Sequence, residues 1–369
     1  MRKWLPLFML RSRKGISFAH AQHERTHTNT VRPELVEGRA LSVSNVLLGV
    51  LLCWIGWHLF DWAVLNAVFR PDAVACHALE GRGACWGVVA EKYRVILFGR
   101  YPVNAQWRPL LATLLMLALL GASVMPRLRN RGLWGIWAVG LMLFLLLMKG
   151  GLFGLANVDT PRWGGLPLTL ILSVFGLAGA FPLAVLLALG RNGRLPVVRT
   201  LCTVFIELVR GVPLVAVLFM AAFLFPLFMP RGWEFPALLR VLVGIILFAA
   251  AYMAEVIRGG LLAVPRGQTE AAQALGLSYW QVQLGVVLPQ ALRNVLPSLM
   301  NSAVALFKDT SLVIIVGLFE LTGALGLAVD GDPKWRAFAL DGYLFIALIY
   351  WIGCFTLSRY SRSLEDKTA

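Results

Sequence analysis

The sequence predicts an all-α polytopic membrane protein with about eight transmembrane helices. Hydrophobic residues make up 59% of its 369 residues and charged residues only 14%, whereas a soluble domain has about 25% charged residues. The hydrophobic residues form long uninterrupted blocks instead of the stripes of amphipathic helices. These observations exclude a group of soluble domains, a disordered chain and a disulfide scaffold.

Eight segments have the length and composition of membrane spans, because a helix needs about 20 apolar residues to cross the bilayer core. Five of them are supported by runs without Asp, Glu, Lys or Arg, at 41–60, 109–126, 132–148, 163–190 and 211–230. Another uncharged run, 271–292, is rich in Gln, so we predict that it lies at the membrane surface. The predicted spans are residues 44–66, 109–126, 133–148, 166–190, 199–229, 237–257, 294–319 and 341–358.

The number of Lys and Arg residues alternates between successive segments that connect the predicted spans. Three of them occur in each of the segments 126–132, 191–199, 258–293 and 359–369, and one or two in 149–165, 230–236 and 320–340. Because Lys and Arg mark the cytoplasmic side of a membrane protein, both termini are predicted to be cytoplasmic. This prediction places a basic segment, 1–43, and a tail, 361–369, in the cytoplasm and the long loop 67–108 outside. The net charge is +15, and the basic residues flank hydrophobic blocks. We therefore expect a lipid bilayer and no nucleic acid as partner.

Residues 1–43 carry no sign of function. His20, His23 and His27 fall at helical spacing, but no fourth ligand accompanies them, so we expect no metal site. The stretch TVRPELVEG at 30–38 resembles peptides translated from dispersed repeat elements of some bacterial genomes. The sequence therefore leaves open a start of translation further downstream.

Cys76 and Cys85 lie nine positions apart in the loop predicted to be exported, where oxidation is chemically allowed. A disulfide between them and two reduced thiols both fit the sequence. The other cysteines, Cys53, Cys202 and Cys354, lie in or beside spans, where Cys usually serves as a small apolar side chain.

Motifs for nucleotide or catalytic chemistry are absent from the sequence. It contains no G-x-x-x-x-G-K-[ST], no H-E-x-x-H and no G-x-S-x-G. We therefore expect no catalytic residue and no enzyme activity in this chain.

The polar segment 258–293 is predicted to form two short helices with a break between them. Pro265 opens the first helix, and Glu270 lies in its first turn, where a carboxylate complements the helix dipole. Gly276 suits a left-handed stop, Ser278–Gln281 forms a capping box for the second helix, and Pro289 marks its end or a kink. A docking surface for another protein and a hairpin at the membrane surface both fit this pattern.

This segment resembles the EAA signature of ABC-importer permeases, which consists of EAA, three residues, Gly, nine residues and I-x-L-P. Val286 replaces Ile, and the matching residues are Glu270, Ala271, Ala272, Gly276, Leu288 and Pro289. Three flanking words resemble the polar-amino-acid branch of that family, FIELVRGVPL at 205–214, YMAEVIRGG at 252–260 and KDTSL at 308–312. The resemblance covers about residues 166–360 and implies a five-helix type I permease core.

The extension at 44–165, with three predicted spans and the loop 67–108, resembles the membrane subunits of general L-amino-acid importers. Such a subunit lies in the bacterial inner membrane and pairs with a second, related permease chain. The resemblance implies an importer of general or polar L-amino acids. A permease of the same class for opines or for basic amino acids alone remains the alternative, since a binding protein sets much of the specificity.

The resemblance further implies that the helices at about 265–288 are coupling helices, seated in a separate ATPase dimer. Glu270 would contact basic groups of that ATPase, and Gly276 would permit the tight turn. ATP and Mg²⁺ would be bound by the ATPase, and no cofactor by this chain. A periplasmic amino-acid-binding protein would deliver the solute, and a second permease chain or a second copy of this chain would complete the path.

Charged residues in or near the predicted spans are costly in a bilayer and therefore suggest function. The candidates for a polar pathway or gate are Glu207, Arg210, Glu255, Arg258, Lys308 and Asp309. Within the first two pairs the members lie three residues apart on one helix face and can pair. The alternative, which we favour, is that these pairs hold helices together or that long basic side chains reach an interface.

A secondary transporter driven by an ion gradient is the main alternative from another class. It needs an ion site at the bilayer midplane, with broken helices in matching halves, and no repeat relates residues 1–165 to 166–369. The missing catalytic motifs disfavour a membrane-embedded enzyme. Glu270→Lys distinguishes the two transporters, because it should abolish transport only where an ATPase docks.

Overall fold

The computed structural model describes residues 43–125, 132–152, 154–230, 232 and 235–368. The three histidines of the N-terminal segment and most of the basic loop 126–132 lie outside these ranges. The described residues form helices joined by turns, and their β pairing is limited to two isolated bridges. The first helix, α1 (Val43–Phe60), has no buried residue.

Residues 58–369 fold as one unit built around long helices. Its elements are α2 (Ala73–Ala78), α3 (Gly87–Phe98), α4 (Trp107–Val124), α5 (Gly132–Lys149), α6 (Gly165–Asn192), α7 (Pro196–Arg210), α8 (Leu214–Phe219), α9 (Ala237–Ala263), α10 (Arg266–Ala274), α11 (Tyr279–Val282), α12 (Leu288–Asp309), α13 (Leu321–Asp330) and α14 (Ala339–Thr368). Within the described residues, seven helices can cross a membrane by length and composition, or eight if one bent pair is a single span. The predicted all-α polytopic fold with about eight transmembrane helices is confirmed.

One predicted span, 199–229, is not a continuous helix. It consists of α7 and of a second piece, Leu214–Phe228, that is bent by 105° against α7. The break falls at Gly211-Val212-Pro213, because proline removes a backbone donor and disfavours a helical residue before it. The predicted span 199–229 is therefore a bent pair of helices and not one continuous helix.

The helix α7 has an exposed apolar face. Four side chains spaced four, three and four residues apart form this face, and each is more than half exposed: Val197, Leu201, Val204 and Leu208. Glu207 and Arg210 interrupt the pattern at the end of the helix. An amphipathic helix of this kind suits the membrane interface or a contact with another helix.

The second of the two predicted short helices is also different in the structure. The helix that begins at Tyr279 continues through a π-helical turn, η7 (Gln283–Val287), into α12, so Pro289 neither ends nor isolates it. The N–H of Leu288 donates to the carbonyl of Gln283, five residues back. This register change accommodates Pro289, which has no N–H to offer to the preceding turn. Only α10 is a separate short helix in this segment.

Small residues allow α6 and α9 to pack closely at the centre of the unit. Gly176, Ala180, Ala184 and Ala188 recur at every fourth position of α6 and are all buried. A Cβ on Gly176 would lie 3.1 Å from the Cγ2 of Ile245 in α9. Membrane helices commonly approach through such small residues, and this row of small side chains brings the two helices into close contact.

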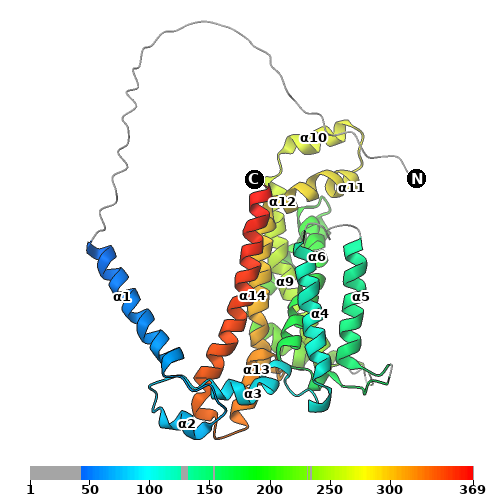
Figure 1. The fold of residues 1–369 in the computed structure, drawn as a ribbon. Coiled ribbons are helices and arrows are strands. Elements are labelled where there is room, and N and C mark those ends of the chain that lie inside the picture. The colour runs from blue at the N-terminus through cyan, green and yellow to red at the C-terminus, as the bar shows by residue number, and fades with distance from the viewer. Residues whose placement is uncertain (1–42, 126–131, 153, 231, 233–234, 369) are drawn as a thin grey trace, which may run out of the picture. The chain divides into compact units, whose positions relative to one another are not determined.

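At one end of this unit α10 and α11 project from the bundle, and α2, α3 and α13 lie at the other end (Figure 1). There, Cys76 and Cys85 form a disulfide, with their Cα atoms 5.5 Å apart. Both cysteines belong to a buried cluster that joins α3 to α13 and α14. The same contact includes an ion pair between Lys92 Nζ and Asp332 Oδ2, which lie 2.8 Å apart. The part of the extension that contains α2 and α3 therefore packs directly on α13 and α14.

Candidate functional site

The loop between α10 and α11 is a tight elbow that its own sequence specifies. Gly276 has φ +76°, in the left-handed region that glycine adopts without strain. Its N–H donates to the carbonyl of Gln273 at 2.9 Å, and the N–H of Leu277 donates to the carbonyl of Ala272 at 3.3 Å. These two bonds form the Schellman motif that ends many helices. The left-handed stop predicted at Gly276 is confirmed.

The next helix begins with the predicted capping box. The N–H of Ser278 donates to Oε1 of Gln281 at 2.8 Å, and the Ser278 side chain accepts from the backbone in return. A hydrogen bond of 3.3 Å between Gln268 and Gln290 then ties α10 to α12. The elbow is thus a rigid feature attached to a long membrane helix.

The elbow exposes both charge and apolar surface. Glu270 and Ala271 are exposed, whereas Ala272 is buried and anchors α10 to the bundle. Leu275 is 78% exposed and Trp280 60% exposed. Large apolar side chains exposed beside polar ones commonly mark a protein interaction surface. Of the remaining EAA residues, Gly276 lies at the elbow, while Leu288 and Pro289 begin α12.

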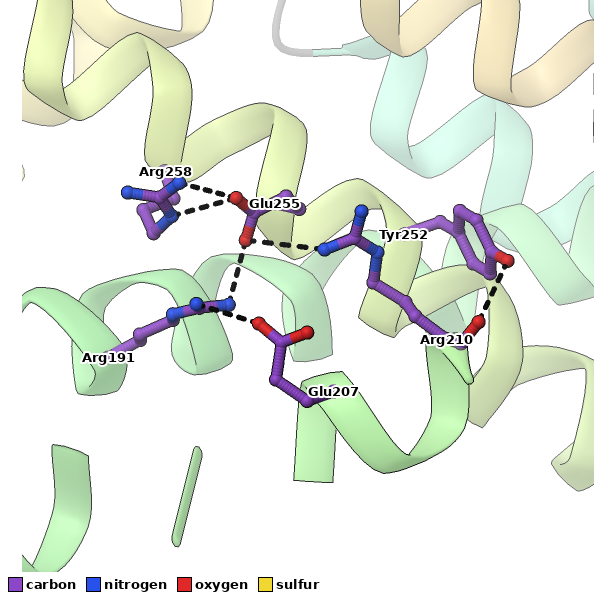
Figure 2. A network of polar contacts seen from close by, with 6 residues as sticks. All are labelled: Arg191, Glu207, Arg210, Tyr252, Glu255 and Arg258. Carbon is purple, nitrogen blue, oxygen red and sulfur yellow. Dashed lines mark hydrogen bonds and ion pairs between the residues drawn. The ribbon is translucent and has the colours of Figure 1, made fainter. Parts of the chain in front are cut away.

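Three arginines from α6, α7 and α9 surround the Glu255 carboxylate, and we call them, together with Glu255 and Glu207, the Glu255 cluster (Figure 2). Arg191 Nη1 donates to Glu255 Oε2 at 2.8 Å, and Arg258 Nε donates to Glu255 Oε1 at 3.0 Å. Arg210 Nη1 lies 3.8 Å from Glu255 Oε2. Arg191 also donates to Glu207 Oε1 at 2.8 Å. Three arginines therefore surround two glutamates.

The spacing of Glu207 and Arg210 allows them to pair, but each has another partner in the structure. Glu207 binds Arg191 of α6, and Arg210 lies over the ring of Tyr252 and near Glu255. Sequence reasoning missed Arg191, because it counted this residue only as loop charge. Its position in the last turn of α6 is the signal that could have indicated it. The pairing of Glu255 with Arg258 is as the spacing suggests.

Lys308 and Asp309 differ in their exposure. Lys308 is exposed, whereas Asp309 is half-buried, and no ion pair joins them. Lys308 continues an exposed stripe along α12 that also contains Asn294, Ser298 and Asn301. Exposed polar side chains along a membrane helix are costly in lipid, so this face points to water or to a polar partner. We call these four residues the α12 stripe. Their spacing of four, three and seven residues could have indicated this polar face in the sequence, but sequence reasoning missed it.

Glu320 is a second residue that sequence reasoning missed. Its side chain is fully buried, and Oε1 accepts from the N–H groups of Thr322 at 2.8 Å and Gly323 at 3.1 Å, capping α13. Oε2 accepts from Tyr350 Oη at 2.7 Å and from Thr169 Oγ1 at 3.3 Å. The carboxylate thus joins α6, α13 and α14 by hydrogen bonds alone.

Within the described ranges, no group of three or more His, Cys, Asp or Glu side chains is arranged to hold a metal ion. Outside the membrane, the hydrogen bond from Lys92 holds the pKa of Asp332 below its ordinary value. This pair belongs to the contact between α3 and α13 and not to a catalytic centre.

Comparison with known proteins assigns the chain to a family. Residues 180–369 match the family described as "Binding-protein-dependent transport system inner membrane component". The chain is 47% identical over 336 residues to the "Inner membrane amino-acid ABC transporter permease protein YhdY" of Escherichia coli, covering 88% of this chain and 90% of that protein. It is 34% identical over 393 residues to the "Glutamate/glutamine/aspartate/asparagine transport system permease protein BztC" of Rhodobacter capsulatus, covering 89% and 90%.

Among solved structures, an amino acid ABC transporter with histidines is similar at 28% identity and a TM-score of 0.49, over 55% of this chain and 92% of that chain. The chain belongs to the family of binding-protein-dependent transport system inner membrane components, the permeases of ABC importers.

Proposed function

We propose that this chain is a permease subunit of an ATP-driven importer of L-amino acids and that its α10–α11 elbow docks a separate ATPase. The observation that carries this proposal is the exposed elbow at Gly276, which presents Glu270, Leu275 and Trp280. A charge beside large apolar side chains suits an interface with another protein. The names of YhdY and BztC, one an amino-acid permease and one specific for glutamate, glutamine, aspartate and asparagine, support amino acids as the solute class.

The coupling mechanism follows from the continuity of the helix after the elbow. ATP and Mg²⁺ would be bound by the ATPase, which would also supply the catalytic residues for hydrolysis. When the ATPase closes, it moves α10 and α11. Because α11, η7 and α12 form one uninterrupted helix, that movement reaches the membrane without passing through a flexible joint.

The α12 stripe supplies part of the translocation path in this proposal. Its side chains, from Asn294 to Lys308, would face the solute between two permease subunits. The second subunit is a related chain or another copy of this one. The Glu255 cluster lies where α6, α7 and α9 meet, and its ion pairs would hold these helices together at a gate.

The proposed orientation puts both termini and the elbow in the cytoplasm of a bacterium. A periplasmic binding protein would then deliver the solute to the end that carries α2, α3 and α13. The Cys76–Cys85 disulfide supports this orientation, because disulfides persist on the exported side. It lies at the end of the bundle opposite α10 and α11 (Figure 1).

Charge reversal at the elbow tests the docking step. Glu270→Lys should abolish ATPase co-purification and amino-acid uptake, because a like charge would face basic groups of the ATPase. Glu91→Lys, which reverses another exposed glutamate, in α3 at the other end of the bundle, should leave the ATPase bound. If both variants retain the ATPase and transport, the elbow is not the docking site.

Two uptake measurements separate the alternative functions: one varies the solute, and the other varies the energy source. Uptake that continues in ATP-depleted vesicles with an intact ion gradient would favour a secondary transporter. Uptake restricted to opines or basic amino acids would keep the ABC class and change the solute.

A further inference from the structure

The helix α7 stands at nearly a right angle to the piece of chain that follows it. That piece, Leu214–Phe228, is bent by 105° against α7 and lies in a run without charged residues, so it suits the membrane interior. With 15 residues, α7 is about 22 Å long at 1.5 Å per residue, shorter than the hydrocarbon core of about 30 Å. It begins at the elbow end of the bundle, where the Arg194 guanidinium lies 5.9 Å from the centre of the Tyr279 ring of α11. Its length and direction therefore fit the plane of the membrane surface at that end.

Three sides of α7 differ in what they meet. One side packs on the bundle, because Ile206 is fully buried. A helix turns by about 100° per residue, so the exposed apolar face described above lies roughly opposite Ile206 and points away from the bundle. Thr200, Thr203 and Glu207 form a polar flank between these two sides. An apolar face beside a polar flank, on a helix in the plane of the surface, is typical of an interfacial helix.

The charges at the start of α7 are positive. Arg194 and Arg199 are exposed, and no Asp or Glu occurs between residues 191 and 206. Arg199 donates to the carbonyl of Gly193 through Nε at 3.0 Å and Nη2 at 2.6 Å, which holds its charge beside the turn that carries Arg194. The first acid that follows, Glu207, accepts from Arg191 at 2.8 Å. The excess charge of this turn is therefore cationic and complements anionic lipid headgroups.

We propose that α7 is an interfacial helix that binds anionic phospholipid. Its exposed apolar face enters the leaflet at the elbow end, and Arg194 and Arg199 bind the headgroup. The inference goes beyond the proposed function, because it concerns lipid and neither the solute nor the ATPase. Since Glu207 and Arg210 lie at the other end of the same helix, the leaflet also holds one side of the Glu255 cluster in place.

Lipid binding to the purified transporter tests the role of the arginines. Native mass spectrometry measures how much phosphatidylglycerol and phosphatidylcholine the complex retains after incubation with each lipid. Phosphatidylglycerol should be retained in preference to phosphatidylcholine. Arg194→Gln and Arg199→Gln should each weaken phosphatidylglycerol binding about 5-fold, and the double variant about 25-fold, from the usual contribution of one basic side chain near an anionic surface.

The matched control is the double variant Arg70→Gln and Arg162→Gln. It removes two other exposed arginines, one in the loop before α2 and one before α6. This control should bind phosphatidylglycerol like the unmodified chain. Equal phosphatidylglycerol affinities for the two double variants would overturn the inference.

Lysine variants separate charge from the structure of the turn. Arg194→Lys and Arg199→Lys keep the positive charge, but a lysine cannot reproduce the contact of two nitrogens with the Gly193 carbonyl. Both variants should bind phosphatidylglycerol like the unmodified chain. If they lose binding as the glutamine variants do, the arginines act by shaping the turn, and their assignment to the headgroup is wrong.

Photo-cross-linking in native membranes tests what covers the apolar face. A photoreactive residue at Leu201, which is 66% exposed on that face, should form adducts with the mass of a phospholipid. The same residue at Thr200, exposed on the polar flank one position earlier, should not. Capture of a second permease chain or of any other protein at Leu201 would assign the face to a protein contact and overturn the inference. Equal lipid capture at both positions would contradict the orientation of the helix.

Discussion

Removing the carboxylate at the centre of the Glu255 cluster should loosen the junction of α6, α7 and α9. Glu255→Gln keeps the side-chain shape but leaves Arg191, Arg210 and Arg258 without their shared anion. Glu255 is 23% exposed and accepts three hydrogen bonds from Arg191 and Arg258. Hydrogen bonds to charged groups are worth about 1.5–3 kcal/mol each when buried, and exposed pairs at most about 1 kcal/mol.

A partly exposed site with three such bonds should therefore lose about 2 kcal/mol of stability. Thermal unfolding of the purified complex measures this loss as a Tm lowered by a few degrees. The matched variant is Glu207→Gln, because its side chain is 55% exposed and pairs with Arg191 alone. It should lose less than about 1 kcal/mol. Equal Tm values for the two variants would refute the view that Glu255 is the centre of the cluster.

Three further changes are expected to have measurable effects. Arg108 is buried and donates at 2.8 Å to the carbonyls of Leu147 and Ala156, so Arg108→Met should cost roughly 3 kcal/mol in thermal unfolding, and an unchanged Tm would contradict this. The pKa of Asp332 is lowered in the folded protein. Its contribution to the free energy of unfolding is therefore complete above the ordinary pKa of 3.8 and is lost as the pH falls through the lower folded pKa. When stability is measured against pH in the acid range, Asp332→Asn should lack this loss. Gly276→Ala places a side chain at φ +76°, so it should lower the stability by about 1 kcal/mol and weaken ATPase co-purification. The control is Gly267→Ala in α10, where a Cβ meets open space and neither effect is expected.

The local structure of the elbow could be predicted from the sequence because each step has its own chemistry. Gly276 supplies the left-handed stop, and Ser278 with Gln281 supplies the cap. The length of the next helix could not be predicted in the same way. Pro289 usually ends a helix, yet the π-helical turn before it removes the conflict. Such a register change leaves no trace in a hydropathy pattern.

The tertiary contacts of the charged residues were also beyond sequence reasoning. Spacing along one helix suggests neighbours such as Glu255 and Arg258, and the structure contains that pair. It does not indicate that Arg191 from another helix reaches both Glu207 and Glu255. Glu320 was missed for a similar reason, because its partners Thr169 and Tyr350 are 151 and 30 residues away.

The claim that the α10–α11 elbow docks an ATPase is tested most directly by site-specific photo-cross-linking in native membranes. A photoreactive residue at Leu275, which is 78% exposed, should cross-link to a protein that mass spectrometry identifies as a P-loop ATPase. The same residue at Leu227, which is 76% exposed in the second half of the bent pair, should not capture that protein. Absence of the ATPase at Leu275, or equal capture at both positions, would contradict the account.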